Sequence, residues 1–378
     1  MEQRLQALIN SSREEEQIKL ALERKRQGSR VIGVISTYVP EEVLSAAGLL
    51  PWRVFATQTA DITLAGAYRP RNSNEYCTRV LESVLRGELD FLDGIILSDI
   101  DHEFLRLWDV LTHLKKFPLC YIMHAPFHDE EVAVRFMENE IRKLIAVLQN
   151  FTGVRITEEA LLASIDTYNR MRILLGKVYE LRKKDRPPLL GTEALGLTMA
   201  AQLIPRAEFI QELEVLLPFL GKREANLPAT RPRLLVVADY LYDPRYLELI
   251  EKYGCVAMDD LDVGSRYIKG LVDTTLEEPV YSLAKRYLSR HGGPATISWD
   301  RQIQQLKWWV REYRIDGILS LPLQWDYHPM YRMPILIKEL EEANIRHMSF
   351  EREFLLTHTE QFRTRIEAFA EILQTEAK

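Results

Sequence analysis

Apolar residues occur along the chain in short runs, separated by longer stretches in which apolar and polar residues recur with helical spacing. Runs of about four to eight apolar residues bounded by turn residues are typical of strands buried on both faces of a parallel sheet. The sequence predicts such strands at 31–35, 93–98, 119–123, 234–238, 255–258, 317–321 and 347–350. Strands that alternate with helical stretches favour the α/β class, in which helices pack between parallel strands.

Helices are predicted where apolar residues recur at every third or fourth position. Pro40, followed by two glutamates, favours a helix start, and Gly48 suits the end of that helix. Thr157 suits the N-cap of a long helix that stops before the prolines at 187–188. Further helices are expected at 129–150, 192–220 and 361–373, and at 3–27 as a polar helix that lies exposed or packs against a partner.

One motif occurs in both halves of the chain. Asp93-Gly94 and Asp316-Gly317 each open an apolar strand that leads to an acidic loop, a helix and a further strand. We therefore expect two Rossmann-like parallel-sheet domains joined by a helical segment. The expected parts are an N-terminal helix at 1–28, a first α/β domain at 29–150, a helical connecting segment at 151–230 with a linker at 228–232, and a second α/β domain at 231–378.

Composition and charge exclude several classes of protein. The chain has 378 residues, which exceeds one ordinary domain. Its 49 Lys and Arg against 55 Asp and Glu give a net charge of −6, whereas a nucleic-acid partner calls for a basic face. No apolar run approaches the ~20 residues that span a bilayer, and the charged N-terminus lacks the apolar core of a signal peptide. We expect a cytoplasmic protein whose partners include neither nucleic acid nor membrane.

Candidate chemistry lies in the loops after the strands, because open α/β sheets bind ligands at the carboxyl ends of their strands. The sequence contains no glycine-rich nucleotide motif, no nucleophile elbow and no paired zinc histidines. We expect the loops that follow the strands to converge on one cleft between the two domains. They hold polar side chains at Ser36, Tyr38, His102, His124, His128 and His328, and an acidic stretch at 259–262. Histidines in separate loops and a solvated acidic stretch predict no metal site.

Four groups of residues carry a family pattern. The first runs from Tyr38-Val39-Pro40-Glu41-Glu42-Val43 to Ala46-Ala47-Gly48-Leu49-Leu50-Pro51. The others are Asp101-His102 with Leu107-Trp108-Asp109, the stretch 260–267 (DLDVGSRY), and 361–369 (QFRTRIEAF). Together these motifs resemble the 2-hydroxyacyl-CoA dehydratase and benzoyl-CoA reductase family, in the right order over most of the chain.

This resemblance implies a subunit of an enzyme that acts on an acyl-CoA thioester. Subunits of the family pair, and each typically holds a four-iron four-sulfur cluster through cysteines from three loops. An ATP-dependent activator supplies an electron, and the thioester is reduced to a ketyl radical that loses hydroxide or accepts further hydrogen. The resemblance thus implies a cytoplasmic heterodimer of anaerobic metabolism.

The cysteines depart from the family pattern. Cys77 matches the first cluster position, but Ile100 and Trp325 stand at the second and third, and Cys120 and Cys255 are predicted core residues. A cluster of this kind normally needs about four thiolates, so we expect no cofactor in this chain and the cluster in a homologous partner subunit. Bulky apolar residues would fill the space that a lost cluster leaves, since a cavity costs about 24 cal/mol per Å³. We expect Cys77, Ile100 and Trp325 to lie within about 8 Å of one point, a span set by one cluster and its ligand bonds.

Three interpretations stay open at this point. In the first, the chain is a dehydratase or reductase subunit that works with a cluster-bearing partner and the activator, and its pocket or interface includes Ser36, Tyr38, Glu41, His102 and Arg266. In the second, it is a non-catalytic, cluster-free paralogue that serves as a scaffold or acyl-CoA-binding module. In the third, it holds a cluster through unusual ligands such as Cys77, Asp99 and Asp326.

Overall fold

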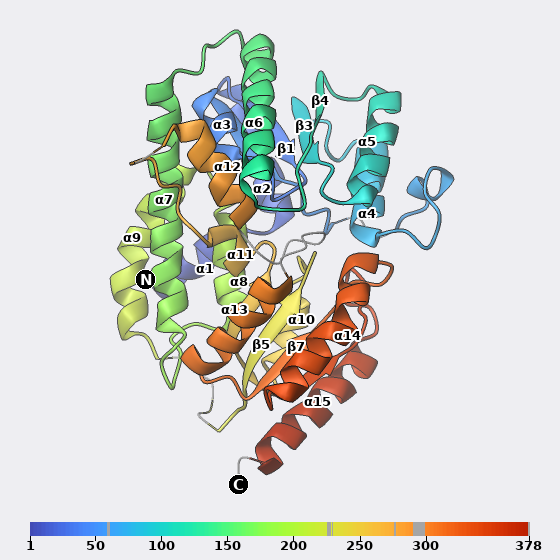
Figure 1. Cartoon of the computed structure of the whole chain (residues 1–378), viewed down its shortest axis with the longest axis vertical. Coiled ribbons are helices and arrows are strands. Elements are labelled where there is room, and N and C mark those ends of the chain that lie inside the picture. The colour runs from blue at the N-terminus through green and yellow to red at the C-terminus, as the bar shows by residue number, and fades with distance from the viewer. Residues whose placement is uncertain (59–60, 225–227, 229, 276, 290–298, 377–378) are drawn as a thin grey trace.

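Two parallel four-stranded sheets form the centres of the upper and lower parts of the molecule (Figure 1). The computed structural model describes all residues except 59–60, 225–227, 229, 276, 290–298 and 377–378, so that one residue of the predicted linker, 229, lies outside the described residues. The first sheet has the order β2-β1-β3-β4 and consists of β1 (Arg30–Val34), β2 (Leu49–Arg53), β3 (Gly94–Ser98) and β4 (Leu119–Met123). The second has the order β6-β5-β7-β8 and consists of β5 (Arg233–Ala238), β6 (Cys255–Leu261), β7 (Gly317–Ser320) and β8 (His347–Ser349). The predicted α/β class with two Rossmann-like sheets is confirmed.

Helices pack around both sheets and also form the segment of the chain that connects the two sheets. The first half contains α3 (Glu41–Ala46), the 3-10 helix η1 (Ala65–Ala67), α4 (Glu75–Leu85), α5 (His102–Leu114) and α6 (Glu131–Thr152). The connecting segment contains α7 (Glu158–Leu181), α8 (Gly191–Ala200) and α9 (Arg206–Lys222). The second half contains α10 (Arg245–Ile250), α11 (Ser265–Ile268), α12 (Pro279–Ser289), α13 (Trp299–Glu312), α14 (Tyr327–Glu342) and α15 (Thr359–Glu376).

Side-chain caps fix three of these helices where the sequence offers them. The Asn74 side chain accepts hydrogen bonds from the backbone N–H groups of Tyr76 and Cys77, and so begins α4. Asp101 caps α5, and Thr157 caps α7 as its sequence position predicted. A capping oxygen satisfies backbone N–H groups that have no partner in the first helical turn. The caps of α4 and α5 therefore fix the residues that flank the candidate site.

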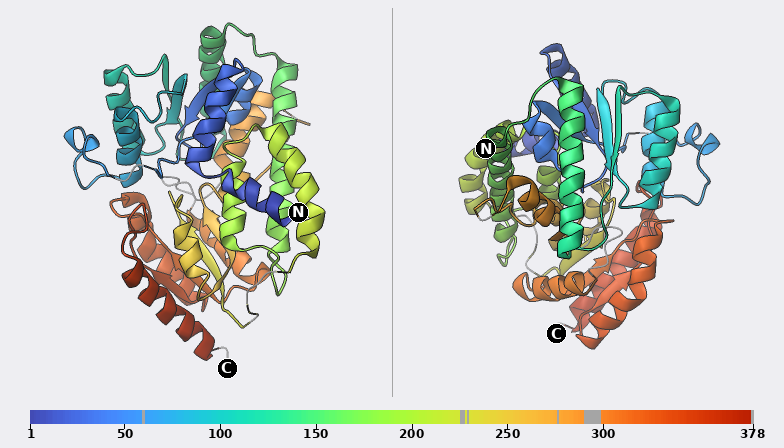
Figure 2. Two further views of the ribbon diagram at one scale, coloured as in Figure 1. Left: turned by 180° about the vertical axis from the view of Figure 1, so that it is seen from behind. Right: turned by 45° about the horizontal axis from the view of Figure 1, so that its top comes forward.

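Several elements differ from the sequence prediction, and three of them have a clear local reason. The expected N-terminal helix is two helices, α1 (Glu2–Asn10) and α2 (Glu14–Arg26), because the hydroxyls of Ser11 and Ser12 donate to carbonyls of the last turn of α1 and the chain turns there. Figure 2 shows α1 against α8 and α9, where Leu5 is buried. The stretch 192–220 is likewise divided, since Pro205 separates α8 from α9. The edge strand β2 was not predicted.

The Asp-Gly motif performs the same structural role in both sheets. A carboxylate oxygen of Asp93 accepts from the backbone N–H of Val31 at 2.7 Å, and a carboxylate oxygen of Asp316 accepts from that of Arg233 at the same distance. The backbone N–H of Asp93 also donates to the carbonyl of Val31 at 2.8 Å, and that of Asp316 donates to the carbonyl of Arg233 at the same distance. The repeated motif thus fixes the start of the third strand against the first strand in each sheet.

The two sheets share one hydrophobic core. A continuous cluster of buried side chains extends from Val31 in β1 to Leu373 in α15. Helix α12, although it belongs to the second half, packs against α6, and the Tyr281 hydroxyl donates to Glu131 at 2.6 Å. The boundaries of the expected domains stay a prediction, whereas the core itself crosses them. Within the part of the chain that the structure describes, no helix is long and apolar enough to cross a membrane.

Candidate functional site

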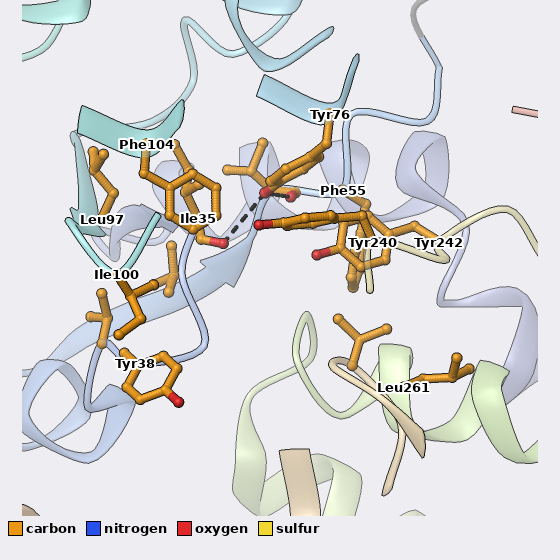
Figure 3. Close-up of a cluster of buried hydrophobic side chains, with 14 of the residues drawn as sticks. Ile35, Tyr38, Phe55, Tyr76, Leu97, Ile100, Phe104, Tyr240, Tyr242 and Leu261 are labelled. Atoms are coloured by element: carbon orange, nitrogen blue, oxygen red, sulfur yellow. Dashed lines mark hydrogen bonds between the residues drawn. The ribbon is translucent and has the colours of Figure 1, made fainter. Parts of the chain in front are cut away.

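The loops after the strands of both sheets meet around a set of buried rings. We call Phe55, Tyr76, Phe104, Tyr240, Tyr242 and Phe354 the interdomain aromatic cluster (labelled in Figure 3 except for Phe354). The ring of Tyr76 stacks on that of Tyr240 with 5.2 Å between centroids, and on that of Phe354 with 5.8 Å. Side chains of this size bury much apolar surface and favour such stacked and edge-on contacts. Rings from α4, from α5 and from the loops after β2, β5 and β8 therefore meet here, and the centre between the sheets is packed with side chains and is not an open cleft.

Two tyrosine hydroxyls of this cluster bind carboxylates. The Tyr240 hydroxyl donates to Asp101 Oδ2 at 2.9 Å, which links the loop after β5 to the loop after β3. The Tyr242 hydroxyl donates to Asp262 Oδ2 at 2.7 Å. Burial comes first among the causes that raise the pKa of Tyr240 well above its ordinary value, and the nearby Asp101 charge adds to it. Both hydroxyls thus stay protonated and serve as hydrogen-bond donors.

Three buried carboxyl groups gather beside the cluster: Asp101, Asp239 and Asp326, each at most 4% exposed. Burial, followed by repulsion from Asp101 and Asp239, raises the pKa of Asp326 well above its ordinary value, and Arg332 opposes this only in part. Like charges brought together out of water favour the protonated form of one member. The arrangement therefore favours the protonated, neutral form of Asp326.

Of the three cluster-position residues, Cys77 and Ile100 are buried at 0% and 1% exposure, whereas Trp325 is 41% exposed. Burial raises the pKa of the Cys77 thiol well above its ordinary value, the nearby Arg69 opposes this, and the charges of Asp101, Glu103 and Asp326 add to it. Since Asp101 follows Ile100 and Asp326 follows Trp325, both loops approach Cys77. The common point within about 8 Å stays a prediction. Trp325 does not act as a buried filler, in contrast to Ile100, which lies in the core beside Tyr38 (Figure 3).

The donor set does not fit a four-iron four-sulfur cluster. The three cysteines lie in α4, β4 and β6, and Cys77 is held as a neutral thiol. Among the described residues no three His, Cys, Asp or Glu side chains are placed to hold a metal ion. Asp99, one of the unusual ligands considered, instead binds the His124 ring at 2.6 Å and the backbone N–H of Ala125 at 2.8 Å. The residues at these positions therefore cannot supply the thiolates that such a cluster needs.

Two of the candidate pocket residues close the end of the first sheet. The hydroxyl oxygens of Ser36 and Ser98 lie 2.6 Å apart, and Ser36 Oγ also accepts from the backbone N–H of Tyr38 at 3.1 Å. Ser36 and Tyr38 are buried at 1% and 2% exposure. They hold the loop after β1 in place and do not line an open pocket.

His102 is the exposed member of the candidate set. Its ring stacks on that of His328 from the second half, with 6.4 Å between centroids. His328 Nε2 lies 4.0 Å from Asp101 Oδ1. The two histidines thus reach solvent directly above the buried carboxyl groups, at the junction of the two halves.

Glu41 is not a pocket residue. It is 4% exposed, and Oε2 accepts from Arg206 Nη2 at 2.7 Å and from the Tyr267 hydroxyl at 2.8 Å. Its neighbour Glu42 pairs with Arg172 of α7 and accepts from the Tyr287 hydroxyl of α12 at 2.7 Å. We call these two glutamates and their partners the buried glutamate network; it joins α3 to the connecting helices and to the second half.

The acidic stretch at 259–262 is not a solvated loop. Strand β6 runs to Leu261, so Asp259 and Asp260 lie inside a fully buried strand. Asp259 pairs with Arg182 at 2.8 Å, while Arg266 donates to both oxygens of Asp260 at 2.8 and 2.9 Å and pairs with Asp239. Paired charges can be buried where lone charges cannot. Arg266 is therefore a buried ion-pair residue rather than an exposed ligand.

Sequence reasoning missed the loop after β5, which supplies Asp239, Tyr240 and Tyr242. The signal that could have found it was present, because this loop directly follows a predicted strand and the carboxyl ends of parallel strands carry the binding residues. Its neighbours Ser36, Asp101 and Asp326 were found by that same rule or by the family pattern.

Comparison with known proteins agrees with the family pattern. The family model described as 2-hydroxyglutaryl-CoA dehydratase, D-component, matches residues 36–373. The chain is 25% identical to the (R)-2-hydroxyglutaryl-CoA dehydratase, subunit beta, of Acidaminococcus fermentans, over 92% of this chain and 94% of that protein. It is 23% identical to the (R)-phenyllactyl-CoA dehydratase beta subunit of Clostridium sporogenes, over 92% and 93% of the two chains. It is also 23% identical to a benzoyl-CoA reductase subunit of Thauera aromatica, over 85% of each.

Proposed function

Because the chain belongs to the 2-hydroxyglutaryl-CoA dehydratase D-component family, we propose that it is the cluster-free subunit of an acyl-CoA dehydratase or reductase. In this proposal it pairs with a homologous subunit that bears a four-iron four-sulfur cluster. An ATP-dependent activator supplies a low-potential electron to that partner, and an acyl-CoA thioester is the substrate. The relatives named as beta subunits support the pairing.

The observation that carries the proposal is the chemistry of the cluster positions. Iron–sulfur clusters are held by thiolates. Here the only cysteine at a cluster position is the buried, neutral Cys77, and Ile100 and Trp325 have no thiol to offer. If the assembly transfers electrons as the family pattern implies, the cluster belongs to the partner.

The candidate pocket residues then divide by exposure. Ser36, Tyr38 and Arg266 are buried and hold loops in position, whereas His102 and His328 face solvent at the junction of the two halves. The exposed Trp325 lies one residue before the buried Asp326 in the same region of the chain. We propose that this histidine pair and Trp325 contribute to the surface that meets the partner subunit or its acyl-CoA.

The test is anaerobic co-expression of the tagged chain with a homologous cysteine-bearing subunit, followed by separation of the two chains and iron and acid-labile sulfide analysis of each. Iron is expected with the partner alone, and it should be unchanged in Cys77→Ser and in the matched control Cys120→Ser. Turnover of an acyl-CoA should require both chains and the activator. Iron bound to this chain and lost in Cys77→Ser would contradict the proposal, and full turnover without this chain would favour the scaffold interpretation.

A further inference from the structure

Helix α14 carries an apolar face that lies toward solvent. Its exposed side chains recur at every third or fourth position, which places them on one side of the helix. Tyr331 is 75% exposed, and Tyr327, Met330 and Ile335 are 45%, 38% and 43% exposed. We call these four residues and the exposed Pro334 the α14 stripe. A surface helix ordinarily has polar residues on its solvent side, so folding of the chain by itself does not account for the stripe.

The opposite face of α14 is already packed. Leu336 and Leu340 are at most 9% exposed, and they belong to a core cluster that includes Ile318 of β7 and Leu306 of α13. Figure 1 shows the helix at the right of the second half, with α5 above it. One apolar face therefore holds α14 in the fold, and the α14 stripe remains available for contact with another molecule.

The α14 stripe is large for an apolar surface in water. An aromatic side chain offers about 150–250 Å², so the exposed fractions of Tyr327 and Tyr331 leave roughly 180–300 Å² uncovered, to which Met330 and Ile335 add. Soluble monomers rarely expose a continuous apolar patch of more than a few hundred Å². A stable pair of proteins covers about 800 Å² on each partner, with an apolar centre and a polar rim. The stripe has the size of such a centre.

The two ends of α14 are electrostatically complementary. Glu341 and Glu342 continue the spacing of the stripe and are exposed in the last turn, at the negative end of the helix dipole, where acidic residues are unfavourable. The first turn is the positive end, and His328 in that turn stacks on His102 of α5. Two antiparallel copies of α14 would bring each acidic end beside the positive end of the other copy. The charges therefore favour a second copy of this chain as the partner.

We propose that the α14 stripe is the centre of a two-fold interface between two copies of this chain, with their α14 helices antiparallel. A two-fold axis places the same surface of both copies face to face. With the axis near Tyr331, this ring would lie against its counterpart, and Met330 and Ile335 would pack on either side of it. The inference does not rest on the proposed subunit role, because it concerns the isolated chain. A homologous subunit that uses the histidine pair would compete with the second copy for this region.

The experiment is sedimentation equilibrium of the full-length chain over the micromolar concentration range, in which the wild type should be a dimer that dissociates on dilution. Tyr331→Glu should weaken dimerisation at least about thirtyfold, the loss typical of a central aromatic contact, while the far-ultraviolet circular dichroism stays unchanged. Val215→Glu, which places the same charge at a 44% exposed apolar position of α9, is the matched control and should leave the dimer intact. The double variant Glu341→Lys, Glu342→Lys should weaken the dimer at low salt and less at high salt.

Tyr331→Cys tests the geometry independently. Near a two-fold axis the two introduced thiols lie close enough to form a disulfide, so mild oxidation should give a covalent dimer, whereas Val215→Cys should not. A wild type that is monomeric over the whole range, a dimer that Tyr331→Glu leaves intact, or a Tyr331→Cys chain that does not cross-link would each overturn the proposal. A wild type that is monomeric alone, but binds a homologous subunit that Tyr331→Glu no longer binds, would assign the stripe to that subunit and also overturn self-pairing.

Discussion

Glu42 offers a quantitative test of the buried glutamate network. Its side chain is fully buried, pairs with Arg172 and accepts from the Tyr287 hydroxyl at 2.7 Å. Burial by itself would raise the pKa of this carboxyl. The charges of Arg172 and Arg286 and the hydrogen bond from Tyr287 outweigh burial and hold the pKa at about 2, against an ordinary 4.5.

This lowered pKa has a definite sign in stability. A carboxyl whose pKa is lower in the folded chain contributes stability above its unfolded pKa and loses it as the pH falls through the folded value. At ~1.4 kcal/mol per pH unit, a fall from 4.5 to about 2 corresponds to ~3 kcal/mol at pH 7. That contribution should vanish progressively between pH 4.5 and about pH 2.

Glu42→Gln removes this contribution and leaves the guanidinium of Arg172 buried without its counter-charge. Breaking a buried pair from one side costs about 3–5 kcal/mol. Urea unfolding followed by circular dichroism should show that loss at pH 7. The difference in the free energy of unfolding between wild type and variant should become smaller as the pH falls from 5 to 3.

The matched control is Glu212→Gln, which breaks an exposed pair with Arg4. The two side chains are 39% and 45% exposed, so this variant should cost less than about 1 kcal/mol at any of these pH values. The reasoning would be refuted if Glu42→Gln were no less stable than the control variant at pH 7. It would also be refuted if the difference in the free energy of unfolding between wild type and Glu42→Gln stayed constant down to pH 3.

The remaining predictions concern packing and two further titrating groups. Gly94→Ala should destabilise the first sheet by about 1–3 kcal/mol in urea unfolding, because the added Cβ would lie 2.7 Å from Leu119 Cβ; an unchanged midpoint would contradict this. Asp326→Asn should change thermal stability at pH 7 by less than Asp101→Asn does, because the structure favours the protonated form of Asp326, which an amide resembles, while Asp101 accepts hydrogen bonds from the Tyr240 hydroxyl and from the backbone N–H of Glu103. Lys269→Met should remove a rise in stability with pH between 8 and 10, because burial lowers the pKa of Lys269 to about 8 and the unfolded chain then binds the proton more tightly; a wild-type profile that is flat in this range would be inconsistent with that pKa.

Most of the strands that the sequence predicted are buried, and their apolar runs are nearly continuous, as in β1, β3 and β5. Strand β2 was not predicted because it is an edge strand with Pro51 in its middle, and a proline within an apolar run ordinarily argues against a strand. At an edge proline costs little, since its missing N–H would face away from the neighbouring strand. Helix boundaries failed for a similar local reason at Ser11 and Ser12, whose back-bonding hydroxyls compete with helix continuation.

Strand topology and the family pattern predicted part of the candidate site. Both led to Cys77 and to the loops that hold Asp101 and Asp326, yet neither could show that Tyr240 binds Asp101, because that contact exists only once the two sheets are packed together. The burial and pairing of charged residues were the hardest features to predict. Asp259 and Arg182 occur in polar stretches typical of solvated surface, and only the fold brings their opposite charges together in the core.

The shared core affects when the chain can complete its folding during synthesis. Synthesis proceeds from the N-terminus, so the whole first sheet and Tyr76 leave the ribosome before the rings that cover them exist. Tyr76 stacks on Tyr240 and on Phe354, which are translated 164 and 278 residues later. At ~5–20 residues per second, the nascent first half therefore displays uncovered aromatic surface for many seconds. Completion of the core must wait until almost the entire polypeptide has been released, and chaperones that bind exposed rings have their longest opportunity on this half of the protein.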